Sequence, residues 1–444
     1  MEITRHCLVI LNCKYTQPAV PEIHLVKRRS HFTRIVLSPH YTESGDFMGN
    51  EISLNYIEEK LESYLQRVYK HLHRYPELST EEYGTQKFIE SELQKLNIPY
   101  KKMADTGLCA KIRGDQPGNT ILLRSDIDAL PITEQTDLEY KSKKEGAMHA
   151  CGHDAHITVG LGVGALLQES KAKLKGTVKI MFQPSEEVHP GGAIRMIEEG
   201  ILENPKVDAA ICMHTNPYLL PGQFEVKEGY MLASSDRIYI SLIGKGGHAA
   251  APHQSVDAIA MAGQFISNIQ NIVARQVSPV DNAVVTIGKI QGGYTSNAIA
   301  DRVDLSGTVR TIKKETQDAI EVKIEELLQS VTNFWGGSYT YKYERGYPAT
   351  WNDKRMTQMA KNAGEICIGK NSMVELENPY MSGDDFVYLS SSVPSVFIYW
   401  GTGTEGKESF PWHHPKFHVN LMSLKYGVAL AAQIILTFLN EEQA

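Results

Sequence analysis

Residues 148–156, MHACGHDAH, concentrate side chains that can bind a metal ion. The stretch holds three histidines, a cysteine and an aspartate, and Gly152 separates Cys151 from His153. A glycine permits a tight turn that would direct both neighbouring side chains to one centre. A Cys-x-His pair alone is more often incidental than functional, so a metal site needs further ligands from elsewhere in the chain.

Other polar residues follow predicted strands. Asp126 ends the apolar run NTILLRSD, Glu186 and Glu187 come after GTVKIMFQ, and His214 ends VDAAICMH. In an open parallel sheet, ligands bind beyond the carboxyl ends of the strands, so we expect these residues to converge. Taken singly, a Glu–Glu pair is usually solvated and a strand-end histidine is usually hydrogen-bonded. Their common position at the carboxyl ends of predicted strands favours a shared metal site.

The chemistry of these side chains favours a first-row divalent ion. Thiolate, imidazole and carboxylate together suit Zn²⁺ or Mn²⁺, whereas Mg²⁺ and Ca²⁺ prefer oxygen ligands alone. A late segment, WHHPKFH, adds three candidate imidazoles, namely His413, His414 and His418.

The segment GKGGHAAAPH, residues 244–253, has a different interpretation. Its glycines and lysine suggest a phosphate loop, but it lacks the G-x-x-x-x-G-K-[ST] spacing. We therefore exclude a nucleotide site and expect the glycines to permit close backbone approach.

The elements that position these residues follow from hydrophobic periodicity. Apolar spacing predicts helices over residues 55–75, which Pro76 ends, and over 83–98. Beyond them, apolar strands at 119–126, 176–183 and 207–214 alternate with helices at 154–170 and 191–202. Such alternation predicts an α/β fold with a mixed, mainly parallel sheet and helices on both faces.

The middle of the chain has another pattern. Strands at 235–244, 283–292, 302–311 and 338–346 alternate apolar and polar residues, and helices at 255–273 and 316–334 lie between them. The order strand, helix, strand, strand, helix, strand predicts a ferredoxin-like α+β unit. We place this unit at 234–343, inserted into a first domain that comprises 48–233 and 344–444. Residues 1–47 are expected to be a disordered extension, with a targeting or binding arm as the alternative.

Composition narrows the class of protein. A chain of 444 residues exceeds what one core usually organises, and a net charge of −7 argues against nucleic-acid binding. No apolar run approaches the roughly 20 residues of a membrane span, and no signal peptide is evident. Six widely spaced cysteines do not form a disulfide framework. We therefore expect a cytoplasmic protein with no membrane and no nucleic-acid partner.

Six motifs stand in an order that resembles a known family. They are RSDIDALPI, MHACGHDAH, FQPSEEVHPGGA, GKGGHAAAPH, NAIADRVDLSGTVRT and HHPKF. Together they resemble the branch of dinuclear metallopeptidases that contains aminoacylases, hippurate hydrolases, plant auxin-conjugate hydrolases and N-acetyldiaminopimelate deacetylases, with carboxypeptidase G as a distant relative. The resemblance extends from about Glu51 to Leu439. It implies a zinc-exopeptidase-like catalytic domain with an inserted satellite domain that often mediates dimerisation.

The resemblance also implies roles for individual residues. Glu186 would be the general base, and His414 is a weaker ligand candidate than His413. Two divalent ions per subunit are expected, Mn²⁺ or Zn²⁺ first, with Co²⁺ or Ni²⁺ as alternatives. Asp126, His149, Asp154 and His156 would orient ligands or support the fold. The implied metal ligands are Cys151, His153, Glu187, His214 and His413.

Three satellite residues match substrate-binding positions of the family. His248 would support the oxyanion, in its own subunit or in a partner's active site, and Arg310 would hold a substrate carboxylate. Asn297 completes the set. The alternatives are a surface ion pair for Arg310 and a turn cap for Asn297.

These residues predict a metal-dependent amidohydrolase that cleaves N-acyl amino acids and forms a homodimer or homotetramer. A dipeptidase or carboxypeptidase of the same family is the alternative enzyme. A non-catalytic protein that binds amino-acid conjugates is the alternative of another class.

Overall fold

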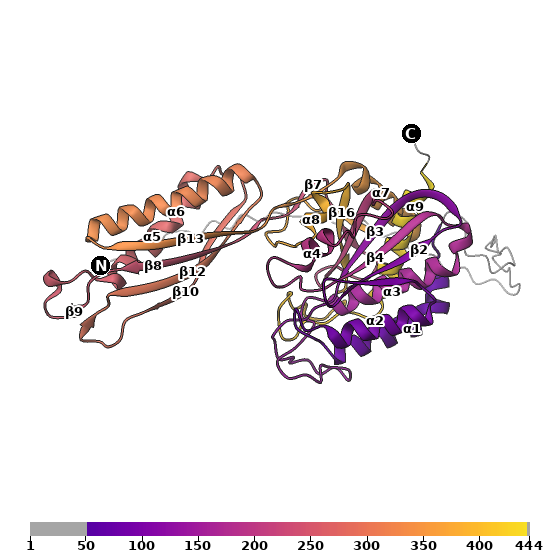
Figure 1. Cartoon of the computed structure of the whole chain (residues 1–444), viewed down its shortest axis with the longest axis horizontal. Helices are drawn as coiled ribbons and strands as arrows, with labels where there is room; N and C mark the ends of the chain where they lie inside the picture. The colour runs from indigo at the N-terminus through magenta and orange to yellow at the C-terminus, as the bar shows by residue number, and fades with distance from the viewer. Residues whose placement is uncertain (1–50, 442–444) are drawn as a thin grey trace, which may run out of the picture. The chain divides into compact units, whose positions relative to one another are not determined.

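The computed structural model describes residues 51–441, so the predicted extension at 1–47 lies outside the described residues. An eight-stranded sheet has the order β1-β2-β4-β3-β5-β16-β6-β15 (Figure 1). Strands β4, β3, β5 and β16 pair in parallel, whereas β1, β2 and β4 pair antiparallel. The predicted mixed, mainly parallel sheet is confirmed. Its strands are β1 (Tyr100–Met103), β2 (Gly107–Arg113), β3 (Gln116–Asp126), β4 (Lys175–Gln183), β5 (Ala209–Asn216), β6 (Phe224–Glu225), β15 (Met373–Val374) and β16 (Ser395–Gly401).

Helices cover both faces of this sheet because its central strands are apolar on both sides. Every residue of β5 and β16 is buried, as expected for nearly continuous apolar runs in a parallel sheet. Alternate strand residues enter two separate hydrophobic cores. One core contains α1 (Leu54–Arg74), α2 (Tyr83–Lys95), α3 (His153–Glu169), α7 (Lys354–Cys367) and α9 (Ser423–Asn440), and the other contains α4 (Gly192–Glu198) and α8 (Val387–Ser390).

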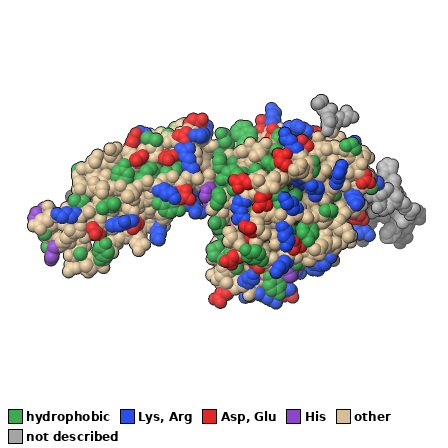
Figure 2. Space-filling view, viewed as in Figure 1, with side chains coloured by type: hydrophobic (Ala, Val, Ile, Leu, Met, Phe, Trp, Pro, Cys, Tyr) green, Lys and Arg blue, Asp and Glu red, His purple; other side chains and the backbone are tan. Residues whose placement is uncertain are grey.

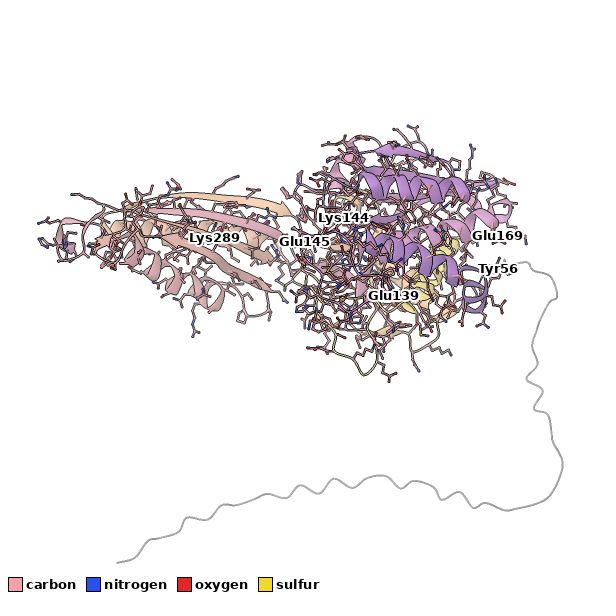
Figure 3. The ribbon with its side chains drawn as sticks, turned by 90° about the horizontal axis from the view of Figure 1, so that it is seen from below. Tyr56, Glu139, Lys144, Glu145, Glu169 and Lys289 are labelled. Atoms are coloured by element: carbon pink, nitrogen blue, oxygen red, sulfur yellow. The ribbon has the colours of Figure 1, made fainter. Side chains whose placement is uncertain are left out.

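Glycines let helix α3 pack tightly. A Cβ on Gly160 would lie 2.7 Å from Oγ of Ser125 on β3, which confirms that small residues bring this helix close to the sheet. A Cβ on Gly162 would instead meet side chains of α1 and α9. At the far end of α3, Glu169 lies beside Tyr56 of α1 (Figure 3). Burial and a hydrogen bond with Glu169 raise the pKa of Tyr56.

Helix α9 corrects one expectation. Among the described residues, it alone is long and apolar enough to span a membrane by length and composition, so the statement that no run approaches that length is wrong for this segment. However, 78% of the helix is buried within the fold. Burial of this extent is what the core helix of a globular domain shows.

A second, four-stranded sheet has the order β10-β12-β8-β13, and all its pairs are antiparallel. Two helices cover one face (Figure 1), and that face carries the apolar residues Ile238, Ile240 and Leu242 of β8. This is the predicted ferredoxin-like arrangement; the domain boundaries at 234 and 343 stay a prediction. The elements are β8 (Ser235–Ile243), α5 (Ala258–Asn271), β10 (Ala283–Gly292), β12 (Arg302–Thr311), α6 (Lys314–Trp335) and β13 (Ser338–Tyr347).

Short elements complete the fold. Strand β7 (Gly229–Leu232) pairs with β14 (Thr350–Asn352), and β9 (Gly247–His248) pairs with β11 (Ala298–Ile299). Single turns of other helix types occupy Lys171–Lys173, Pro252–Gln254 and Ile272–Gln276. A Cβ on Gly247 would lie 2.1 Å from Oγ of Ser255, so close approach is confirmed for this glycine-rich segment. Acidic and basic side chains are interspersed over the visible face (Figure 2).

Candidate active site

A cavity of about 310 Å³ is lined by several of the residues singled out by sequence. It lies where β4 and β5 end, as expected for a sheet of this type. Its lining includes Cys151, Glu186, Glu187, His214, Arg310 and His413.

The loop before α3 positions Cys151 and His153. Gly152 has φ +89°, and a Cβ there would lie 2.7 Å from the side chain of Thr215, so a glycine is required on both counts. The hydroxyl of Thr215 donates to the carbonyl of Cys151 at 2.9 Å. His153 is the first residue of α3, directly after this glycine, and is buried.

The ring of His153 is oriented by Asp128. Its Nδ1 donates to the carbonyl oxygen of Asp128 at 2.9 Å, and the Asp128 carboxylate lies 3.2 Å away. The same carboxylate accepts hydrogen bonds from Oγ of Ser79 at 2.7 Å and from the amide of Glu187 at 3.0 Å. The Nε2 of His153 is buried without a hydrogen-bond partner, 3.6 Å from Oδ2 of Asp126 and 4.0 Å from Oε1 of Glu187.

His214 is arranged in the same way. Its Nδ1 donates to the carbonyl of Thr215 at 2.9 Å, which leaves Nε2 at 3.5 Å from Sγ of Cys151. Burial lowers the pKa of His214 well below its usual value and raises that of the Cys151 thiol. Strand β5 runs to Asn216, so the predicted strand end at His214 is two residues short. The histidine nevertheless reaches the cavity.

Of the three late histidines, His413 joins this group. Its backbone amide donates to the carbonyl of Ala150 at 2.8 Å, its φ is +64°, and its Nε2 lies 3.3 Å from Oε1 of Glu187. His414 and His418 instead hydrogen-bond within their own loop, to the amide and the carbonyl of Lys416 respectively.

We call Cys151, His153, Glu187, His214 and His413 the ligand cluster. Potential ligand atoms of Cys151, His153 and His214 lie within 4.8 Å of one another, and so do those of Cys151, Glu187 and His413. The free Nε2 of His153 and the mixed sulfur, nitrogen and oxygen donors fit a divalent transition ion. The structure thus brings the five residues together, and their roles as ligands stay a prediction.

The other polar residues of MHACGHDAH are engaged elsewhere or face the interior. Nδ1 of His156 bonds Asp126, and its Nε2 accepts the amide of Thr215 at 3.0 Å, so neither nitrogen is available to a metal. Asp154 accepts a hydrogen bond from His73 at 2.7 Å. His149 is buried with both ring nitrogens unpartnered, and the structure offers no reason for it.

Glu186 lies next to the ligand cluster and lines the cavity. It is buried, and this burial raises the pKa of its carboxyl group well above the usual value, with Asp384 and Glu187 adding to the effect. The hydroxyl of Tyr347 donates to the Glu186 carbonyl at 2.9 Å, which fixes the backbone of this residue.

A buried ion cluster behind the site was missed by sequence reasoning. The guanidinium of Arg124 lies 2.5 Å from Asp126, 3.0 Å from Asp384 and 2.8 Å from Asp385. Gln183 binds both Arg124 and Asp385 at 2.8 Å. The available signal was a lone arginine inside the apolar strand ILLRSD, since a buried charge requires partners.

The three satellite residues separate in the structure. Arg310 of β12 lines the cavity, whereas His248 and Asn297 are exposed at the β9–β11 pair and do not line it. The main-chain carbonyl of Asn297 accepts a hydrogen bond from the amide of Ala249 at 3.1 Å. Arg310 forms no ion pair with the described residues, so the surface-pair alternative for it is not supported.

Comparisons with known proteins agree with this geometry. The sequence profile of peptidase family M20/M25/M40 matches residues 122–437. N-acetylcysteine deacetylase of Bacillus subtilis (strain 168) is 39% identical over 369 residues, which cover 82% of this chain and 93% of that protein. Thermostable carboxypeptidase 1 of Saccharolobus solfataricus is 34% identical over 387 residues, covering 86% and 97%.

A solved structure from Bacillus subtilis shares the fold. The YXEP protein, described as a dinuclear metal binding peptidase from M20 family, has a TM-score of 0.73 and 35% identity, covering 86% of this chain and 99% of its own. The predicted resemblance is confirmed by these matches along nearly the whole length of the relatives. The chain therefore belongs to peptidase family M20/M25/M40.

Proposed function

We propose that the protein is a metal-dependent amidohydrolase that cleaves N-acyl amino acids to a free amino acid and a carboxylate. The observation that carries this proposal is one cavity lined by Glu186, by members of the ligand cluster and by Arg310. A relative named N-acetylcysteine deacetylase supports the reaction class.

The ligand cluster would hold two divalent ions, with Mn²⁺ or Zn²⁺ preferred and Co²⁺ or Ni²⁺ as alternatives. Such ions supply Lewis acidity to a water molecule and to the amide carbonyl. The bound ions would also keep Cys151 as a thiolate, which its burial otherwise disfavours. The neutral imidazole of His214 is already the form that a metal needs.

Glu186 would act as the general base. Its carboxylate takes a proton from the attacking water and then passes that proton to the leaving nitrogen of the amide. Burial raises the pKa of this carboxyl group above its usual value, which makes the carboxylate a stronger base. Because Glu187 belongs to the ligand cluster, adjacent carboxylates would perform two different tasks.

Arg310 would hold the α-carboxylate of the amino acid. Its side chain is half-buried and has no carboxylate partner among the described residues. The acyl group would lie against the apolar and aromatic lining of the same cavity, formed by Leu232, Tyr399 and Trp412.

A substrate screen tests this function. The protein would be stripped of metal, reloaded with Mn²⁺, Zn²⁺, Co²⁺ or Ni²⁺, and assayed with N-acetyl amino acids, N-benzoyl amino acids and dipeptides. We expect N-acyl amino acids to be hydrolysed best. Preference for dipeptides would favour the carboxypeptidase alternative, which the relative from Saccharolobus solfataricus supports. No hydrolysis in any metal state would favour a binding protein.

We also propose a cytoplasmic homodimer or homotetramer in which His248 and Asn297 serve a partner's cavity. The position of both residues outside the cavity of their own chain supports this. The Glu186→Gln and His248→Ala proteins should each be inactive. Mixing them so that subunits exchange should restore activity, because one site of each mixed dimer then has an intact Glu186 from one subunit and an intact His248 from the other. Equal inactivity of the mixed and separate proteins would contradict the shared site.

A further inference from the structure

Two arginines project into the cavity from the satellite sheet. Arg237 of β8 and Arg310 of β12 both line the cavity. Arg237 pairs with Thr308 across the sheet, and Arg310 lies two residues beyond Thr308. Since strand residues two apart share a face, both guanidinium groups come from the face opposite α5 and α6. The Cα atoms of diagonal neighbours in a sheet are about 7–8 Å apart, so the two side chains start close together.

Neither arginine side chain has a carboxylate as a hydrogen-bond partner among the described residues. Arg310 donates from Nη1 to Oγ1 of Thr308 at 2.6 Å and to the carbonyl of Val309 at 3.4 Å, both uncharged acceptors. The side chain of Arg237 forms no hydrogen bond or ion pair with the described part of the chain. Burial lowers the pKa of Arg310, and the positive charge of Arg237 lowers it further. The negative charge of Asp236 raises the pKa in part. The two positive charges therefore repel each other.

One carboxylate of the cavity lining lies near this pair, and its hydrogen-bond partner is a lysine. Glu344 of β13 stands opposite Arg237 in the register and lines the cavity. Its Oε2 accepts a hydrogen bond from Nζ of Lys342 at 2.9 Å. The satellite side of the cavity therefore carries a net positive charge.

We propose that the amino-acid part of the substrate is itself acidic, so that the enzyme prefers N-acyl dicarboxylic amino acids. This inference rests on the proposed amide hydrolysis. Arg310 holds the α-carboxylate, and Arg237 holds the carboxylate of the side chain. Because both arginines lie on the satellite side of the cavity, a substrate that pairs with both directs its amide bond toward Glu186 and the ligand cluster.

Matched substrates test the proposal. N-acetyl-L-glutamate and N-acetyl-L-glutamine have nearly the same shape and differ in the side-chain charge. We expect kcat/KM to be at least about tenfold higher for the glutamate derivative, the effect of one charge-assisted hydrogen bond. Arg237→Gln should lower the ratio of the two kcat/KM values by about tenfold, and Arg237→Glu should lower it further. Arg310→Gln should lower kcat/KM for both substrates, because both carry the α-carboxylate.

Lys289→Gln is the control variant. Lys289 of β10 (labelled in Figure 3) pairs with Ser306 and projects from the same face, but it lines a separate hollow with Tyr239 and Ser241. Its substitution removes one positive charge and should leave the ratio unchanged. Titration calorimetry with the Glu186→Gln variant gives a second reading, since both compounds can then bind without turnover.

The outcomes separate the two proposals. If the glutamine derivative is hydrolysed equally well and Arg237→Gln leaves the ratio unchanged, the preference for acidic substrates is wrong and the amidohydrolase function stands. If Arg237→Gln and Lys289→Gln change the ratio equally, the effect is long-range charge and Arg237 is not a specificity residue. If no N-acyl amino acid is hydrolysed in any metal state, the function itself fails, and the inference with it.

Discussion

The Nδ1 atom of His153 donates a hydrogen bond to the main-chain carbonyl of Asp128 at 2.9 Å. This contact fixes both the tautomer and the ring orientation of the histidine, so that Nε2 is the nitrogen left for a metal. The Asp128 carboxylate extends the arrangement by accepting from Ser79 and from the amide of Glu187. Asp128 therefore contacts two members of the ligand cluster, His153 and Glu187.

Substitution Asp128→Ala keeps the main-chain carbonyl but removes the carboxylate, which lies 3.2 Å from Nδ1 of His153 and accepts from the amide of Glu187. It should weaken metal binding by about tenfold, the lower end of the effect for residues that orient metal ligands. Metal affinity would be measured by competition with a chelator of known affinity. Ser79→Ala removes a single hydrogen bond to the same carboxylate and should have a much smaller effect. Equal affinities of Asp128→Ala and the wild type would show that the carboxylate of Asp128 does not position the ligands.

Glu186→Gln and Cys151→Ala should separate catalysis from metal binding. The glutamine variant should keep its metal content and lose turnover by about 10²–10⁴-fold, the usual contribution of a general base. Cys151→Ala should instead lose metal occupancy, since it removes the thiolate. Metal content by elemental analysis and kcat on one substrate distinguish the two. Full activity of the Glu186→Gln variant would show that Glu186 is not the general base.

Gly152→Ala should damage the site through both strain and contact. The residue has φ +89°, and the added Cβ would lie 2.7 Å from Thr215. We expect a loss of about 1–3 kcal/mol in the free energy of unfolding, together with weaker metal binding as Cys151 shifts. Gly146→Ala is the control, because Gly146 has φ +74° but nothing within 4 Å of its Cβ position. Similar losses in both variants would attribute the effect to strain alone.

The sequence predicted those features that depend on local pattern. Continuous apolar runs identified the central strands, and short motifs identified Cys151 and Glu187. Contacts between distant segments could not be derived in this way. Arg124 meets Asp384 and Asp385 only because the sheet order brings their segments together. The distance of His248 from its own cavity likewise depends on how the satellite strands extend, which periodicity does not specify.

His73 should make the stability of the protein depend on pH. Its Nδ1 lies 2.7 Å from Asp154 and its Nε2 lies 3.2 Å from Glu134, so both nitrogens donate to carboxylates only in the charged imidazolium. Burial alone would lower the pKa of His73, but the hydrogen bonds with Asp154 and Glu134 raise it to about 9. The unfolded value is about 6.5.

Because the folded pKa lies above the unfolded one, the contribution of His73 is complete below about pH 6.5 and is lost as pH rises through about 9. The difference in unfolding free energy between the wild type and His73→Gln should therefore shrink by about 3 kcal/mol between pH 6 and pH 9.5. Urea denaturation at several pH values measures this. His71→Gln is the matched control: burial lowers the pKa of His71, so its contribution should stay constant above about pH 6.5. A difference for His73→Gln that is independent of pH would mean that His73 is neutral in the folded protein.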